Sequence, residues 1–131
     1  MPVANTEDLR EAAASSLKGV HVLVVEDAWH LAKALKSALT EVGMDVAGPA
    51  ATIAEAERLV SERQPEVAVV DVNLKGEMAY GLIDLLHDRG VRVIIVSGYA
   101  MLPKSTLKAA AILQKPFSVA VLLATLRRVL Q

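Results

Sequence analysis

Side chains that could bind a cation and a phosphoryl group follow short apolar runs in this sequence. They comprise three acids, a hydroxyl and an amine: Glu26, Asp27, Asp71, Ser97 and Lys115. Clustered carboxylates suit a hard divalent cation such as magnesium, which prefers oxygen ligands. A hydroxyl and an ammonium group supply hydrogen-bond donors that phosphoryl oxygens accept. Brought together, these groups would form a site for magnesium-dependent phosphoryl chemistry.

The apolar runs predict strands that would bring these side chains to one place. Their approximate ranges are Val20–Val25, Met44–Ala47, Val67–Asp71, Val91–Val96 and Ala111–Gln114. Helical patterns separate the strands, and this alternation indicates βαβ units and a parallel sheet. The carboxyl ends of parallel strands share one edge of a sheet, where open α/β folds place their sites. We therefore expect one α/β domain with its site at that edge.

Helix signals define most of the remaining elements. Leucines at helical spacing predict a helix over about 31–42. Thr52 and Glu55 form a capping box that starts a second helix, and a third covers about 79–88. Between 98 and 110, glycine and proline leave room for only a short helix, and we expect this segment to be mobile.

The two ends of the chain differ from this pattern. Residues 1–19 combine helix-start chemistry with a tract of alanine and serine, which predicts a short helical arm before a domain at 20–131. The last helix has Ser118 as its expected cap and is apolar nearly all round until Arg127. Such a helix is usually covered on more than one side, so we expect a partner surface or a homodimer through it. The alternative is that its small alanines form an ordinary exposed face.

Composition argues against several classes of function. The chain has 131 residues, which suits one domain, and a formal net charge of −1 without a basic block. Direct binding to nucleic acid or to a membrane surface is therefore not expected. It has no cysteine and three scattered histidines, so any metal would be held by oxygen ligands. With no apolar stretch of ~20 residues and no signal-peptide core, we expect a cytoplasmic protein.

Each candidate residue also has an ordinary structural explanation. Asp27 could simply cap the following helix, Ser97 could be a turn residue, and Lys115 could be a solvated lysine before a proline. Asp71 favours a metal site over these explanations, because carboxylates from two neighbouring strand ends can share one magnesium ion. Without a cation, clustered acids repel one another and raise at least one pKa, so metal binding should stabilise the fold.

The stretches around these residues resemble the signature of response-regulator receiver domains over about 20–131. They are Val24-Val25-Glu26-Asp27, Val69-Val70-Asp71-Val72-Asn73, Val96-Ser97-Gly98-Tyr99 and Lys115-Pro116-Phe117. The resemblance implies a flavodoxin-like (βα)5 three-layer sandwich with a parallel sheet of order 2-1-3-4-5.

By matching position, the resemblance also implies a role for each residue. Asp71 would be the phosphoacceptor, with Ser97 and Lys115 contacting the phosphoryl group. The magnesium ligands would be Asp71, Asp27, Glu26 through water, and the main-chain carbonyl of Asn73. One position departs from the family pattern, because Ile112 stands where an aromatic switch residue is usual. Either Tyr99 or backbone movement would then have to carry the conformational change.

The residues and the resemblance together predict a phosphorylation-dependent switch of a two-component or phosphorelay system. A histidine kinase or histidine phosphotransfer protein would phosphorylate Asp71, and the domain would then change its contacts with a downstream protein. Because no further domain follows Leu130, we expect a stand-alone type that catalyses only its own phosphorylation and dephosphorylation.

Two other functions fit the pattern less well. A small phosphohydrolase with an aspartyl nucleophile usually has a second aspartate where this chain has Asn73. A flavin-binding protein needs an anion-binding loop after the first strand, where Glu26 and Asp27 would repel a phosphate.

Overall fold

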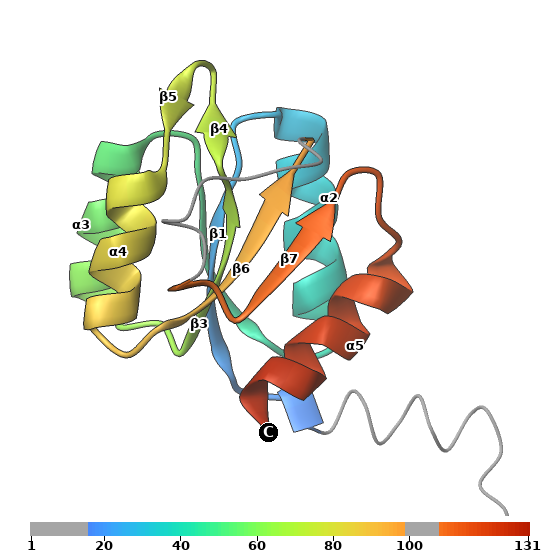
Figure 1. Cartoon of the computed structure of the whole chain (residues 1–131). Coiled ribbons are helices and arrows are strands. Elements are labelled where there is room, and N and C mark those ends of the chain that lie inside the picture. The colour runs from blue at the N-terminus through green and yellow to red at the C-terminus, as the bar shows by residue number, and fades with distance from the viewer. Residues whose placement is uncertain (1–15, 99–107) are drawn as a thin grey trace, which may run out of the picture.

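The computed structural model describes residues 16–98 and 108–131, and its centre is a parallel sheet (Figure 1). The five strands of this sheet are β1 (His21–Val25), β2 (Asp45–Ala50), β3 (Val67–Asp71), β6 (Arg92–Ser97) and β7 (Ala111–Gln114). Their order is β2-β1-β3-β6-β7, and every neighbouring pair is parallel. A separate antiparallel pair, β4 (Asn73–Leu74) and β5 (Glu77–Met78), accounts for the gap in numbering. The predicted flavodoxin-like order 2-1-3-4-5 is confirmed.

Helices cover both faces of the sheet and make a three-layer sandwich (Figure 1). Helices α2 (Trp29–Glu41) and α5 (Val119–Leu130) pack on one face, and α3 (Ile53–Arg63) and α4 (Tyr80–Asp88) on the other. Each face of the sheet has its own hydrophobic core. Because side chains alternate along a strand, Val22 and Val24 of β1 pack in the core with α2 and α5, and Leu23 packs in the core with α3 and α4. Among the described residues, no helix has both the length and the apolar character to cross a bilayer.

Strand β2 differs most from its predicted range. The predicted range was Met44–Ala47, whereas the strand begins at Asp45 and continues through Gly48 and Pro49 to Ala50. Gly48 has a φ of 95°, and the pairing with β1 changes register before it resumes between Val25 and Ala50. A Cβ added to Gly48 would lie 2.7 Å from the carbonyl oxygen of Val24. Both the left-handed backbone and the close approach therefore require glycine at this position.

The helix starts use the capping chemistry read from the sequence. Thr52 Oγ1 accepts the N–H of Glu55 at 3.2 Å, and the Ser118 hydroxyl accepts the N–H three residues further on at 3.1 Å. Helix α2 differs, because its N-cap is Ala28 and no side chain caps it. The carboxylate of Asp27 is therefore not serving as the helix cap.

Only the end of the expected N-terminal arm, residues 16–19, belongs to the described part of the chain. Leu17 is 1% exposed and packs in the core beneath α2 and α5. Its carbonyl accepts the N–H of Val20 at 3.1 Å. The short helix expected between 98 and 110 lies largely outside the described residues, and so does Tyr99.

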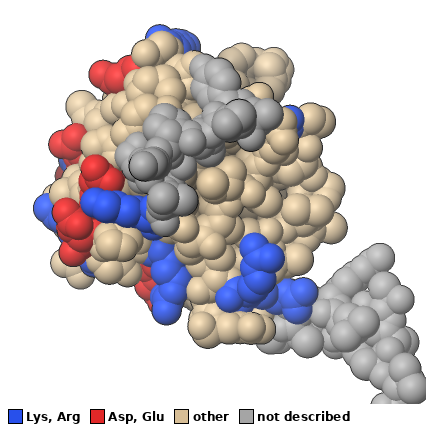
Figure 2. All heavy atoms as spheres, in the orientation of Figure 1, with Lys and Arg blue, Asp and Glu red and all other residues tan. Residues whose placement is uncertain are grey.

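The two helical layers carry opposite charge. Helices α2 and α5 contain four basic and one acidic side chain, whereas α3 and α4 contain two basic and five acidic ones. Figure 2 shows acidic atoms on the side of α3 and α4, with basic atoms among them, and basic atoms over the later part of α5. The small net charge of the chain therefore conceals a separation of charge across the sheet.

Candidate functional site

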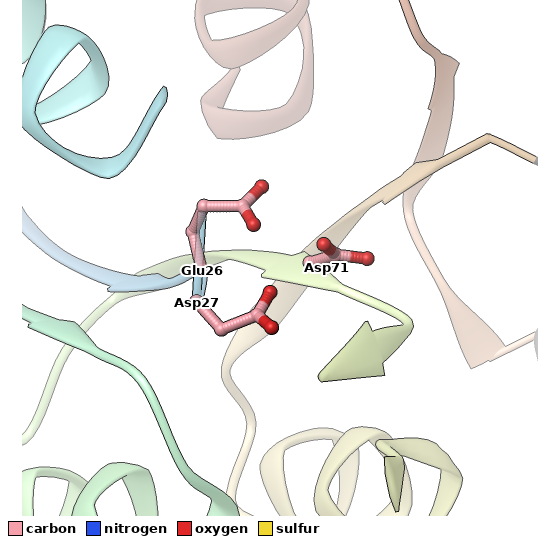
Figure 3. A group of neighbouring side chains, drawn as sticks. All are labelled: Glu26, Asp27 and Asp71. Atoms are coloured by element: carbon pink, nitrogen blue, oxygen red, sulfur yellow. The ribbon is translucent and has the colours of Figure 1, made fainter. Parts of the chain in front are cut away.

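Three carboxylates meet at the carboxyl edge of the sheet (Figure 3). Glu26 and Asp27 follow β1, and Asp71 is the last residue of β3, which pairs directly with β1. Each acid offers one oxygen, and these oxygens lie within 4.8 Å of one another. Glu26 is 2% exposed and Asp71 6%, whereas Asp27 is half-buried. The arrangement follows from the topology, because neighbouring parallel strands end side by side.

Lys115 joins this cluster from the end of β7. Its Nζ lies 3.0 Å from Asp71 Oδ2 and 3.1 Å from Glu26 Oε1. Its main-chain N–H donates to the carbonyl of Ser97 at 2.7 Å, and its peptide bond to Pro116 is cis. One ammonium group is thus shared between carboxylates that follow two different strands.

Asn73 and Ser97 occupy different positions around Asp71. The main-chain N–H of Asn73 donates to Asp71 Oδ1 at 3.0 Å. Its side-chain oxygen accepts the N–H of Gly76 at 2.7 Å within the β4–β5 hairpin. Ser97 ends β6, the strand beside β3, and is fully buried. The structure therefore places a main-chain donor on the Asp71 carboxylate and a hydroxyl-bearing residue at the end of the neighbouring strand.

Sequence reasoning missed the hairpin and the contact between Lys115 and Glu26. A signal for the hairpin was present, since a two-residue turn ending in glycine is typical of one. Lys75 and Gly76 form that turn, with φ values of 53° and 90°. No comparable signal existed for the Lys115 contact, because it depends on how a long side chain lies between two strand ends.

Burial and charge shift the protonation of this cluster. The pKa of Glu26 is raised from 4.5 to about 7, and burial is the largest cause. A hydrogen bond with Asp71 and repulsion from it contribute to the rise, whereas the N–H of Ala28 and the amine of Lys115 oppose it. For Lys115, burial lowers the pKa, but its bonds to Asp71 and Glu26 outweigh burial and raise it above 10.5. Such a cluster favours an additional cation, because one amine faces three acids.

A pocket of about 290 Å³ opens beside the acids. It is lined by Asp71, Val72, Asn73, Gly98 and Lys115. Since one water molecule takes up about 30 Å³ of liquid volume, the pocket has room for a phosphoryl group and several waters. Asp71 belongs both to this pocket and to the cluster of three acids, whose ligand atoms are oxygens and so suit a hard divalent cation. The chain thus combines an acidic cation site with a cavity that can hold a phosphoryl group.

Comparison with known proteins agrees with this geometry. The sequence pattern of the response regulator receiver domain matches residues 22–127. The chain belongs to this family. A curated relative, the transcriptional regulatory protein DesR of Bacillus subtilis (strain 168), is 32% identical over 82 residues. That alignment covers 62% of this receiver chain and 41% of DesR, so the chain spans less than half the length of this relative.

Solved structures of receiver domains share the fold. The non-phosphorylated HemR receiver domain from Leptospira biflexa has a TM-score of 0.75 at 26% identity, covering 86% of this chain and 94% of that one. A CheY-like receiver domain protein from Methanospirillum hungatei JF-1 has a TM-score of 0.77 at 25% identity, with the same coverage of 86% and 94%. The chain is therefore a response-regulator receiver domain of the two-component type, and its class of function is phosphorylation-dependent signalling.

Proposed function

We propose that Asp71 accepts a phosphoryl group from a phosphohistidine of a histidine kinase or histidine phosphotransfer protein. The observation that carries this proposal is the setting of the Asp71 carboxylate. One of its oxygens accepts the N–H of Asn73, the other accepts the Lys115 amine, and the pocket opens beside both. A carboxylate held in this way is oriented for attack on a phosphorus atom that enters the pocket.

The surrounding residues receive roles in the same proposal. Magnesium would be held by Asp71, Asp27, Glu26 through water, and the main-chain carbonyl of Asn73. A magnesium ion bound there supplies positive charge to the phosphoryl oxygens and lowers the barrier to transfer. The Lys115 amine pairs with one phosphoryl oxygen after transfer, and the Ser97 hydroxyl donates a hydrogen bond to another.

The bonds that form and break in the transfer involve only groups of the two proteins. An Asp71 oxygen forms a bond to phosphorus while the bond from phosphorus to the donor imidazole nitrogen breaks, and that imidazole then takes up a proton. The product is an acyl phosphate, which adds negative charge beside Lys115 and Ser97. That charge draws both groups toward Asp71 and shifts the conformation that a downstream protein recognises. A cytoplasmic location belongs to this proposal, because phosphohistidine donors are formed from ATP inside the cell.

The phosphohydrolase alternative gains no support from the described residues. Such an enzyme usually has an acid two residues after its nucleophile, where it can protonate a leaving group. Asn73 stands there, and its side-chain oxygen accepts a hydrogen bond from Gly76. The proposal therefore limits catalysis to the domain's own phosphorylation and dephosphorylation.

Self-association through α5 is a second part of the proposal. Val119 and Val121 are 49% and 47% exposed on this helix, and the alanines at 120 and 124 are exposed beside them. These four residues, which we call the α5 apolar face, would pack against the same face of a second copy.

The substitution Asp71→Asn tests the phosphoacceptor directly. It removes the nucleophilic oxygen, so labelling by radioactive acetyl phosphate in the presence of magnesium should fall to background. Asp88→Asn is the matched control, because Asp88 is an exposed acid on α4, and this variant should be labelled like the unsubstituted protein. Persistent labelling of Asp71→Asn would place the acceptor elsewhere.

A further inference from the structure

The hairpin of β4 and β5 is linked to Asp71 through Asn73. It stands beside the end of β3, at the carboxyl edge of the sheet (Figure 1). The main-chain N–H of Asn73 donates to Asp71 Oδ1 at 3.0 Å, and its side-chain oxygen accepts the N–H of Gly76 at 2.7 Å. A chain of two hydrogen bonds therefore runs from the turn of the hairpin to the Asp71 carboxylate.

The hydrophobic core fixes the base of the hairpin. Val72 and Leu74 are buried in the core with α3 and α4, and the carbonyl of Val72 accepts the N–H of Ala79 at 2.8 Å. Neighbouring side chains of extended backbone point to opposite sides, so Asn73 points away from the core that holds Val72 and Leu74. Its side-chain oxygen is held by the turn instead.

The turn that holds Asn73 requires glycine at position 76. Lys75 has a φ of 53° and Gly76 a φ of 90°, and a two-residue hairpin turn with both central φ values positive is of type I′. Glycine adopts a φ of 90° readily, whereas a residue with a Cβ is strained there. A Cβ added at Gly76 would meet no heavy atom within 4 Å among the described residues. A substitution would therefore act on the conformation of the turn and cause no collision.

We propose that Gly76 is a positioning residue for Asp71, because its N–H holds the Asn73 side chain and so keeps the Asn73 main-chain N–H on the Asp71 carboxylate. The proposal rests on the function proposed above, in which Asp71 is the nucleophile. A carboxylate that is already oriented needs no reordering before it attacks phosphorus, so a looser Asn73 would slow the transfer. Gly76 is not among the residues that line the pocket, so its effect would be exerted through Asn73.

Hydrogen exchange of the Asn73 amide tests this link in EDTA and without a phosphoryl donor. In Gly76→Ala the strained turn should open and release the Asn73 side chain. We expect the Asn73 amide, followed by NMR, to exchange several-fold faster than in the unsubstituted protein. Gly90→Ala is the matched control, because Gly90 is exposed after the end of α4, has a φ of 77° and has equally open space. It carries a similar strain and should leave the exchange of the Asn73 amide unchanged.

Labelling rates test whether the link matters for the reaction. With acetyl phosphate and magnesium, Gly76→Ala should be labelled several-fold more slowly than the unsubstituted protein, and Gly90→Ala at the normal rate. Gly76→Asn should recover part of the lost rate, because asparagine enters the left-handed region more readily than alanine and keeps the N–H. A merely structural role of the glycine would instead give equal effects in Gly76→Ala and Gly90→Ala.

Three results would overturn the inference. Unchanged exchange of the Asn73 amide in Gly76→Ala would show that the turn does not hold Asn73, and would leave the proposed function of Asp71 intact. Faster exchange with an unchanged labelling rate would show that the link does not position Asp71 for transfer. If the unsubstituted protein is not labelled at all, the proposed function fails, and the positioning role fails with it whatever the exchange rates.

Discussion

At the scale of single residues, the site depends on how a few charges share one small volume. Lys115 lies within 3.1 Å of oxygens on both Glu26 and Asp71, yet one ammonium group cannot balance three carboxylates. Glu26 is the most deeply buried of the three acids, so keeping its carboxylate charged costs the most free energy. Proton and cation should therefore compete for the same carboxylate.

This competition predicts a pH dependence of stability. The pKa of Glu26 is about 7 in the folded protein, above its usual value, so the cost of keeping it charged is full above pH 7 and is relieved as the pH falls. In EDTA, the unsubstituted protein should gain roughly 2 to 3 kcal/mol of unfolding free energy relative to Glu26→Gln between about pH 8 and pH 5. Lys115 stays charged throughout this range, because its pKa is raised above 10.5.

Urea denaturation of both proteins across this pH range provides the measurement. A saturating magnesium concentration is the internal control. The cation stabilises the charged carboxylates, so it should stabilise the unsubstituted protein more at pH 8 than at pH 5. Parallel pH profiles for the two proteins in EDTA would show that Glu26 does not titrate as inferred.

The positions of the charged residues could be predicted from sequence, but their contacts could not. Glu26, Asp27 and Asp71 directly follow or end apolar runs, so a parallel sheet alone brings them to one edge. The bridging position of Lys115 depends on a flexible side chain and on the turn after β7. The engagement of the Asn73 side chain depends on a hairpin that has only two residues in each strand.

At the scale of elements, strand β2 shows where local sequence signals mislead. Glycine followed by proline usually ends a strand, but here the strand changes register and continues to Ala50. The contact that makes this possible lies between Gly48 and the carbonyl of Val24 on a different strand. Reading one segment at a time cannot reveal such a contact, whereas caps such as Thr52 and Ser118 are local and were predicted.

The substitution Gly48→Ala should therefore be costly. The new Cβ would lie 2.7 Å from the Val24 oxygen and 2.8 Å from the Ala50 nitrogen, in a backbone with a φ of 95°. We expect a loss of about 2 kcal/mol or more in unfolding free energy by urea denaturation. Gly81→Ala, within helix α4, should instead be neutral or stabilising by up to about 1 kcal/mol. Equal stability of the two variants would contradict the close approach at Gly48.

At the scale of the whole molecule, topology could be predicted because strand and helix signals alternate regularly. Assembly could not be deduced in the same way, since the pattern of α5 suits either a covered or an exposed helix. The structure shows which residue of α5 can be substituted to test association. Leu123 on this helix packs against the core, so replacing it would disturb folding and association together. Val121 on the α5 apolar face is 47% exposed and is the better position.

The substitution Val121→Glu should abolish self-association without unfolding the protein. A charge buried between two copies of the α5 apolar face is unfavourable, because an unpaired buried charge loses its hydration. Light scattering at increasing concentration should show a dimer for the unsubstituted protein and a monomer for this variant. Ala54→Glu is the control, since Ala54 is exposed on α3 in the other layer, and it should leave the dimer intact. A monomeric unsubstituted protein at all concentrations would contradict association through α5.

The unequal charges of the helices in the two layers give this nearly neutral molecule an electric dipole moment across the sheet. The field of a charged partner would exert a torque on such a molecule and rotate it during approach, so that one layer leads. Encounters would then be biased in orientation before any contact forms. Dissolved ions weaken this bias over a distance of about 10 Å at moderate salt, so the orientation of encounter complexes should become more random as ionic strength rises.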